Sequence, residues 1–429
     1  MLEVLRYSWA LLLGMLLLMV GNGLQGTLLG VRGAIEGFSA TEMSFIMSAY
    51  FVGFLGGSRL TPKLIRRVGH VRVFAALGSL ISAVLILYAA APDPWVWTAM
   101  RVLIGFCFSG VYVTAESWLN NSASNENRGK ALSIYMIVQM AGVVAAQGLM
   151  NLADPAGWLL FVIPSVLVSV AFAPILLSVS PAPIFESTKP MTLRQLFDAS
   201  PLGFVGAFLL GGVFAAQFGM SAVYGTTAGL SVAEISIFVS SIFVGGMILQ
   251  YPIGWISDRM DRRVLIMALA AFAAVATALP LLIAPGFPVL VGLAFVMGGV
   301  SNPLYSLLIA YTNDFLEHDD MAAASGGLIF LNGVGATAGP LIIGWLMDLV
   351  GPNGFFGFVS VLFFATAGYA AYRMTQRPTP SAADTVAYAP VVPTASPVAV
   401  ELAQEYAFEQ ALEDEEATEP HVDNKSEAP

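Results

Sequence analysis

The stretch Ser8–Gly30 reads SWALLLGMLLLMVGNGLQGTLLG and contains no charged side chain. A helix needs about 20 mostly apolar residues to cross a bilayer, and this stretch has that length. Its apolar run from Leu11 to Val20 lacks the alternation of a membrane-spanning strand. The stretch therefore predicts a transmembrane helix. It is longer than the apolar core of a signal peptide, so we expect it to be retained.

The remainder of the chain repeats this apolar pattern. Hydrophobic residues make up 57% of the sequence and charged residues only 11%, whereas about a quarter of the residues in a soluble domain are charged. Roughly the first 375 positions divide into apolar stretches of spanning length with short polar breaks between them. The sequence therefore predicts an all-α integral membrane protein with twelve transmembrane helices.

Acidic residues gather at the C-terminal end. The formal net charge is −10, and eleven of the 28 acids but only one of the 18 bases lie from Pro378 onward. This end is rich in Ala, Pro and Glu and has no sustained apolar period, which is typical of disorder. We expect residues 378–429 to form a disordered acidic cytoplasmic tail.

Basic residues predict the orientation of the chain. Sixteen of the 18 bases fall on one side of the predicted spans; Arg32, in a loop on the other side, and Arg101, inside a span, are the exceptions. Because loops rich in Lys and Arg stay in the cytoplasm, we expect both termini there.

A polar, proline-flanked segment, Pro181–Pro201, divides the body. We expect an N-terminal six-helix bundle in residues 1–180, a cytoplasmic linker in 181–200 and a C-terminal six-helix bundle in 201–377.

The two halves resemble each other. An offset of about 193 positions aligns Gly105 with Gly298 and Tyr112 with Tyr305. Two bundles in the same orientation, related by an axis along the membrane normal, place a solute path between them. We therefore expect two pseudo-symmetric bundles around a central path.

The stretch 254–263 reads GWISDRMDRR and resembles a loop that the major facilitator superfamily carries after its second and eighth helices. Asp261 stands where that loop has its later glycine. The copy after the second span departs further, with Pro62 for the leading glycine and Arg66 for the aspartate. The matching residues of the later loop are Gly254, Asp258, Arg259, Arg262 and Arg263.

Two further features carry the resemblance. Arg101 with Gly105 resembles the arginine-containing motif of the family's fourth helix, and Ala115–Ser117 and Asn127–Gly129 resemble its YcaD-like branch of bacterial permeases. The resemblance implies the superfamily's fold, a multi-pass location in the bacterial inner membrane, and a transporter without an established substrate.

Metal and cofactor chemistry find no support in the sequence. Cys107 is the only cysteine, and the three histidines His70, His318 and His421 do not cluster. The chain has no phosphate-binding loop of the Gly-rich, Lys-bearing kind, so ATP-driven transport is disfavoured. We expect no metal, no cofactor, no enzymatic activity and no nucleic-acid partner.

Arg101 is the one base inside a predicted span. A charge at the membrane centre costs on the order of 2.5 to 3.5 kcal/mol, so its presence requires an explanation. We favour a role in gripping an anionic solute or modulating a proton site. The alternative is that the side chain snorkels to the surface.

Uncharged polar residues in the spans are candidates for the solute path. Each has a competing interpretation, because Asn and Gln often hydrogen-bond neighbouring helices and Tyr often sits at the membrane interface. For any one residue we place packing ahead of binding. Together with Arg101, the candidates are Asn22, Gln25, Tyr112, Gln217, Asn302 and Tyr305.

A cytoplasmic gate could be built from breakable charge pairs. Following the resemblance, we expect Asp258 and Arg259 to latch it, with Asp314 or Glu116 as partners. The alternative is that the arginines of this loop serve only topology.

The leading functional hypothesis is a secondary active or facilitative transporter of a small organic solute by alternating access, with proton coupling open. The alternative is a membrane sensor or assembly protein that acts through the acidic tail. The partners expected are a small-molecule solute, membrane lipid and, for a coupled mechanism, protons. An intramembrane enzyme ranks last, because no pair of catalytic groups falls within the spans.

Overall fold

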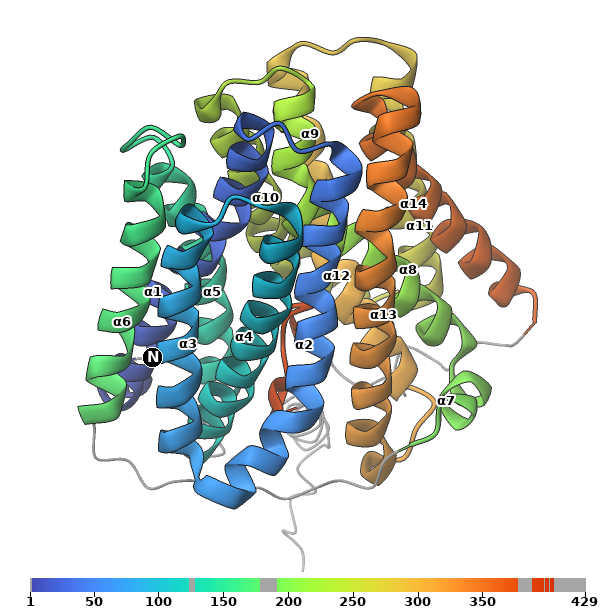
Figure 1. The fold of residues 1–429 in the computed structure, drawn as a ribbon. Coiled ribbons are helices and arrows are strands. Elements are labelled where there is room, and N and C mark those ends of the chain that lie inside the picture. The colour runs from blue at the N-terminus through green and yellow to red at the C-terminus, as the bar shows by residue number, and fades with distance from the viewer. Residues whose placement is uncertain are drawn as a thin grey trace, which may run out of the picture.

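The structure is a computed structural model that describes residues 2–122, 128–177, 191–376, 388–396, 398–400 and 402–404. The first half holds six long helices: α1 (Leu2–Ile35), α2 (Ala40–Val68), α3 (His70–Ala90), α4 (Pro94–Ser122), α5 (Arg128–Leu149) and α6 (Leu159–Leu177). The second half begins with the short α7 (Leu193–Ala199) and a span made of α8 (Pro201–Ala215), the π-helical turn η2 (Ala216–Met220) and α9 (Ser221–Thr227). It continues with α10 (Val232–Ser257), α11 (Arg262–Leu282), α12 (Phe287–Asn313), α13 (His318–Val350) and α14 (Asn353–Met374) (Figure 1).

Ten segments of the described chain are long and apolar enough to cross a membrane. Two of the twelve spans expected from sequence, α2 and α6, fall outside that set. The apolar part of α6 is shorter, and α2 ends in a basic stretch. Both helices nevertheless lie within the bundle, since α6 packs against α1 and α3, and α2 packs against α4 and α13. The prediction of an all-α membrane fold is confirmed.

Corresponding helices of the two halves begin in the same way. Ser39 caps α2 and Ser231 caps α10, and each forms a capping box with a glutamate three residues later, Glu42 and Glu234. A capping box satisfies backbone N–H groups at both residues, and so fixes where the helix starts. The repeat seen in the sequence therefore extends to the helix starts.

Close helix contacts repeat as well. A Cβ atom added to Gly105 would lie 1.9 Å from the carbonyl oxygen of Tyr50, and one added to Gly298 would lie 1.9 Å from that of Ile242. Only glycine permits such an approach between backbones, which is the usual way that membrane helices pack closely. The pairs α2/α4 and α10/α12 are therefore joined by the same contact.

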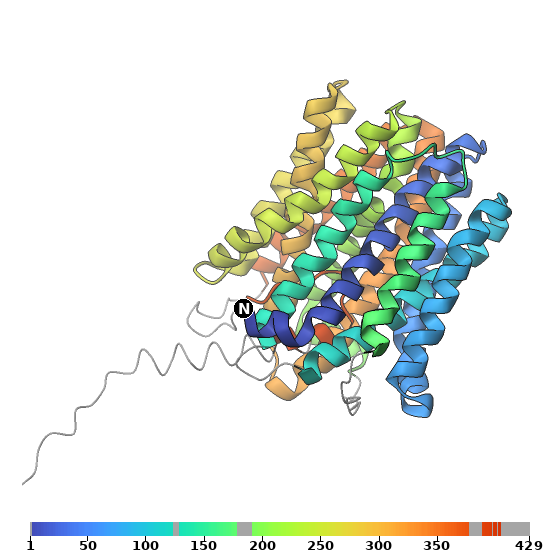
Figure 2. The same cartoon turned by 90° about the vertical axis from the view of Figure 1, so that its left-hand side faces the viewer.

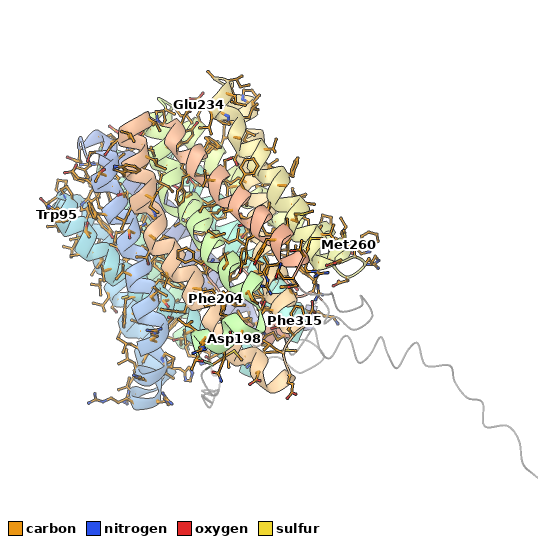
Figure 3. All side chains as sticks on the ribbon, turned by 90° about the vertical axis from the view of Figure 1, so that its right-hand side faces the viewer. Trp95, Asp198, Phe204, Glu234, Met260 and Phe315 are labelled. Atoms are coloured by element: carbon orange, nitrogen blue, oxygen red, sulfur yellow. The ribbon has the colours of Figure 1, made fainter. Side chains whose placement is uncertain are left out.

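The bundle has two distinct ends. We call the end with the α2–α3 turn at Gly69, the α10–α11 turn and α7 the basic end, and the other end the opposite end (Figures 1 and 2). In Figure 3, Trp95 and Glu234 lie toward the opposite end, and Asp198 and Phe315 lie toward the basic end.

The two halves meet directly at the opposite end. The backbone N–H of Thr41 on α2 donates to Asp348 Oδ2 on α13 at 3.2 Å. Nearer the middle of the same two helices, the hydroxyl of Ser48 donates to the carbonyl oxygen of Thr337 at 2.6 Å. Hydrogen bonds and helix packing therefore close the space between the halves there.

A C-terminal segment lies between the halves at the basic end, where it is drawn in red in Figure 1. Val391, Ala399 and Val400 in this segment are buried. The expectation of a disordered tail therefore does not describe these residues, because the walls of the bundle supply the apolar partners that the segment lacks on its own. Most of the remaining expected tail lies outside the described residues.

Candidate functional site

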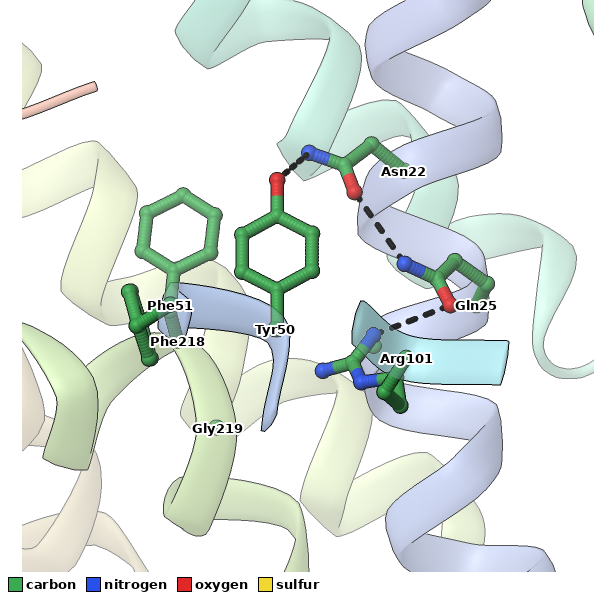
Figure 4. A pocket seen from close by; sticks show the side chains of 8 residues that line it. Asn22, Gln25, Tyr50, Phe51, Arg101, Phe218 and Gly219 are labelled. Atoms are coloured by element: carbon green, nitrogen blue, oxygen red, sulfur yellow. Dashed lines mark hydrogen bonds between the residues drawn. The ribbon is translucent and has the colours of Figure 1, made fainter. Parts of the chain in front are cut away.

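A small pocket lies between the halves. Three helices of the first half and the π-helical turn of the second half contribute to its wall (Figure 4). The lining residues are Asn22, Gln25 and Gly26 of α1, Tyr50 and Phe51 of α2, Arg101 of α4, and Phe218 and Gly219 of η2. A solute in this pocket would contact both bundles.

Hydrogen bonds link the polar residues of the pocket into a chain. Arg101 Nη1 donates to Gln25 Oε1 at 2.9 Å, and Gln25 Nε2 donates to Asn22 Oδ1 at 3.2 Å. Asn22 Nδ2 lies 3.4 Å from the hydroxyl oxygen of Tyr50 (Figure 4). It also lies 3.2 Å from the hydroxyl oxygen of Tyr112. The chain fixes the orientation of both amides, so the groups around the pocket are preorganised.

Arg101 carries the only charge that lines this pocket. Its side chain is 3% exposed, and its guanidinium lies over the ring of Tyr50 with 4.9 Å between Cζ and the ring centroid. Nη2 lies 3.2 Å from the sulfur of Met47, and Nε has no hydrogen-bond partner in the structure. Among the described residues, no carboxylate forms an ion pair with it.

This geometry bears on the two interpretations of Arg101. A snorkelling side chain extends along the protein surface toward the polar membrane boundary. The guanidinium instead lines an internal pocket and has an unused donor. A buried cation with spare donors can accept an anionic group, and a planar guanidinium suits carboxylates and phosphates.

Three path candidates of the second half lie in other surroundings. Gln217 Nε2 donates to the hydroxyl of Ser301 at 2.7 Å, while Asn302 Nδ2 donates to the carbonyl of Gly298 on its own helix at 3.1 Å. The hydroxyl of Tyr305 is buried without a partner in the structure. None of the three lines the pocket, although Gln217 neighbours Phe218 in η2.

The charged residues expected at the gate form a different set of pairs. Arg262 Nη1 lies 2.6 Å from Asp314 Oδ1, and Arg262 Nη2 lies 3.4 Å from Asp258 Oδ1. Arg259 folds back over the ring of Trp255 at 4.1 Å. Arg262, rather than the expected Arg259, therefore contacts both aspartates, because it begins α11 and faces the ends of α10 and α12.

Glu116 lies apart from these pairs. Its Oε1 accepts from the hydroxyl of Tyr135 at 3.0 Å, and its Oε2 accepts from the backbone N–H of Ser396 at 2.9 Å. The structure thus separates the four gate candidates: Asp258 and Asp314 pair with Arg262, Arg259 contacts Trp255, and Glu116 is a buried carboxylate on α4.

Comparison with known families decides what kind of protein this is. The sequence model of the Major Facilitator Superfamily matches residues 11–243 and, again, residues 203–403. The chain belongs to the Major Facilitator Superfamily. The resemblance inferred from the loop and the fourth helix is confirmed.

Relatives and solved structures agree with this membership. An uncharacterized MFS-type transporter of Enterobacter sp. (strain 638) is 26% identical over 378 residues, which cover 87% of this chain and 97% of the relative. The uncharacterized MFS-type transporter YcaD of Escherichia coli O45:K1 (strain S88 / ExPEC) is 27% identical over 364 residues, covering 82% of this chain and 92% of YcaD.

The fold matches crystal structures of two other transporters. The nucleoside transporter NupG has a TM-score of 0.67 at 15% identity, covering 86% of this chain and 98% of NupG. A bacterial homolog to the human lysosomal transporter Spinster has a TM-score of 0.65 at 15% identity, covering 95% of this chain and 97% of that chain. At this identity the likeness concerns the fold.

Membership in the superfamily makes this chain a multi-pass integral membrane protein and supports transport rather than enzymatic catalysis. Of the path candidates, the structure brings Asn22, Gln25, Arg101 and Tyr112 into one hydrogen-bonded cluster. Sequence reasoning missed Tyr50, whose hydroxyl in the middle of an apolar helix was an available signal.

Proposed function

We propose that this superfamily member is a secondary or facilitative transporter of a small organic solute that bears an anionic group. The solute binds in the pocket between the halves, where Arg101 supplies the charge and Asn22, Gln25 and Tyr50 supply oriented hydrogen-bonding groups. The supporting observation is the buried guanidinium, which lines the pocket and has no ion-pair partner among the described residues.

Alternating access follows from the position of this pocket. Its wall includes α1, α2 and α4 of one half and η2 of the other, so a rocking motion of the halves would change which end opens to it. In our proposal, the basic end faces the cytoplasm, because cytoplasmic loops carry the excess of Lys and Arg. The hydrogen bonds of Thr41 and Ser48 to α13 would then hold the outer side closed.

Proton movement is a secondary part of the proposal. Glu116 is a buried carboxylate that accepts hydrogen bonds and forms no ion pair among the described residues. A protonated Glu116 would place no charge in this buried position. Solute flux that acidifies or alkalinises the lumen of proteoliposomes, and stops doing so in Glu116→Gln, would support this role. Flux without any pH change would remove it.

The experiment that tests the proposed function is a thermal-shift screen of the purified full-length protein in detergent. The panel contains carboxylates, phosphate esters, nucleosides and uncharged osmolytes. A ligand at 100 times its dissociation constant raises the free energy of unfolding by about 2.7 kcal/mol, which is readily detected. We expect anionic compounds to stabilise the protein and Arg101→Gln to abolish the shift.

Either of two results would contradict the proposal. Stabilisation by uncharged compounds alone would show that Arg101 is not the recognition group. A folded, monodisperse protein that responds to no solute, even in a variant whose C-terminal segment has been displaced from the basic end, would favour a sensor or assembly protein.

A further inference from the structure

A C-terminal segment, defined as the described residues between Tyr388 and Gln404, lies inside the bundle at the basic end. Its apolar side chains are as buried as those of the helices: Val391 is 1% exposed, and Ala399 and Val400 are both 0% exposed. These residues belong to the main hydrophobic core. The segment is therefore packed into the fold and not laid on its surface.

Its first part contacts the second half of the protein. The backbone N–H of Tyr388 donates to Asp258 Oδ1 at 2.9 Å, at the end of α10. The backbone N–H of Val391 donates to Ser306 Oγ on α12 at 2.9 Å, and Ser306 Oγ lies 3.0 Å from the carbonyl oxygen of Val391. The segment thus follows the inner side of α10 and α12.

Its second part joins the two halves. The backbone N–H of Ser396 donates to Glu116 Oε2 on α4 at 2.9 Å. The side-chain amide of Gln404 donates to Asn313 Oδ1 on α12 at 3.2 Å and also contacts the hydroxyl of Ser325 on α13. Contacts to α4 on one side and to α12 and α13 on the other place the segment between the bundles.

The segment lies on the basic-end side of the pocket. Glu116 follows Arg101 on the same helix by fifteen residues, which at 1.5 Å per residue is about 22 Å toward the basic end. A solute leaving the pocket toward the basic end would have to pass through the space between α4 and α12 that the segment occupies.

The composition of the segment fits the walls that it meets. Its described residues read YAPVVPTAS, VAV and LAQ and contain no charged side chain; Glu401, the one charged residue of the stretch, lies outside the described residues. The bundle presents carboxylates, Glu116 and Asp258, which accept backbone N–H groups of the segment. An acidic stretch in the same place would be repelled, and the sequence places nine of the chain's acids beyond Gln404.

We propose that this C-terminal segment is a built-in plug that blocks the route between the pocket and the basic end. The inference rests on the proposed transport function in one respect, namely that the route carries solute. The plug has two effects. It occupies the solute's route, and it prevents α4 and α12 from approaching each other as closure of the basic end requires, so the segment must leave before the transporter can cycle.

The first test measures occupancy without any solute. Ser306 is 1% exposed beneath Val391, so a thiol at this position reports whether the plug is in place. The variant Ser306→Cys is made in a full-length Cys107→Ala background, and a membrane-impermeant maleimide is added to inside-out vesicles. Labelling should be slow in the folded protein and fast after denaturation, which shows that the thiol is present and reactive.

A matched pair of substitutions then disturbs the plug. Val400→Asp buries an uncompensated charge, whereas Val398→Asp puts the same group on a neighbouring, half-buried position. We expect Val400→Asp to speed labelling of Ser306→Cys by about tenfold or more, since labelling follows the population of the open form. Val398→Asp should have a much smaller effect. Equal rates in the parent and in both variants would overturn the plug.

A cross-link separates this inference from the proposed function. In the Cys107→Ala background, thiols introduced by Ser306→Cys and Val391→Cys should form a disulfide when an oxidant such as copper–phenanthroline is added to membranes, and reduction reverses the disulfide. Failure to cross-link in folded protein overturns the plug, whatever the protein transports. Cross-linking that stops solute flux until the disulfide is reduced supports it, whereas unchanged flux overturns it. If the disulfide forms but Val400→Asp still responds to no solute, the plug stands as a closed element and the transport proposal fails.

Discussion

Replacing Arg101 with glutamine should lower solute affinity while leaving the free energy of unfolding nearly unchanged. The substitution removes the charge-assisted hydrogen bond to Gln25 at 2.9 Å, worth about 1.5 to 3 kcal/mol. It also removes the contact with the Tyr50 ring at 4.9 Å, worth about 0.5 to 2 kcal/mol. Against these losses, it relieves about 2.5 to 3.5 kcal/mol for holding a charge in the membrane interior. The two sides nearly cancel.

Solute affinity has no such compensation. Each hydrogen bond from the guanidinium to an anionic group contributes about 1.5 to 3 kcal/mol, so losing one weakens binding about 10- to 150-fold. A bidentate contact would lose more. The expected signature is therefore a large change in the dissociation constant with little change in the unfolding temperature.

The assay is a titration of purified wild-type protein, Arg101→Gln and a control, Arg32→Gln, with the solute that the thermal-shift screen identifies. Arg32 pairs with Glu36 at 2.5 Å near the opposite end and does not line the pocket, so its removal should not affect binding. Unchanged affinity in folded Arg101→Gln would refute the reasoning. So would a large loss of stability, because it would show that Arg101 is a structural residue.

Two further predictions concern the helices themselves. Arg262→Gln should lower the free energy of unfolding by about 3 to 5 kcal/mol, because it removes the cation that lies 2.6 Å from the buried carboxylate of Asp314; the exposed Arg259→Gln should cost less than about 1 kcal/mol. Thermal unfolding in detergent compares the two, and equal losses would contradict the assignment of Arg262 as the central cation. Gly105→Val should prevent close packing of α2 and α4 and reduce the yield of monodisperse protein in size-exclusion chromatography, whereas Gly148→Val, which meets open space, should not. Normal yield of Gly105→Val would disprove the close approach.

Periodicity and composition predicted the architecture well, because the bilayer leaves few options for an apolar chain of this kind. The repeat gave the correspondence of Gly105 with Gly298, and both glycines make the same backbone contact. Arg101 was recognisable because a charge inside an apolar helix is costly enough to need a reason. The apolar runs, the repeat and the lone charge can all be read from the sequence, because they reflect the apolar bilayer and not particular contacts between distant side chains.

Other features depend on which side chains meet in space. Arg259 and Arg262 are the same residue type three positions apart, and only the start of α11 at Arg262 decides which one reaches the aspartates. Tyr50 joins the pocket through its hydroxyl, although tyrosines in spans are more often interfacial. Val391 and Val400 lie in a stretch that is too small and too irregular to fold alone, and the groove that buries them is made by distant helices.

The π-helical turn η2 has a consequence for the register of its span. A π turn is equivalent to one extra residue inserted into an α-helix, and each residue advances an α-helix by about 100°. The helix after Met220 is thereby rotated relative to a straight continuation of α8. This rotation brings the side of α9 that carries Ala222 against Gly30 of α1. A relative with a straight seventh span would align to this chain with a single-residue gap between residues 216 and 220. Deleting one residue there would turn the α9 surface away from the first half while leaving the length of the span almost unchanged.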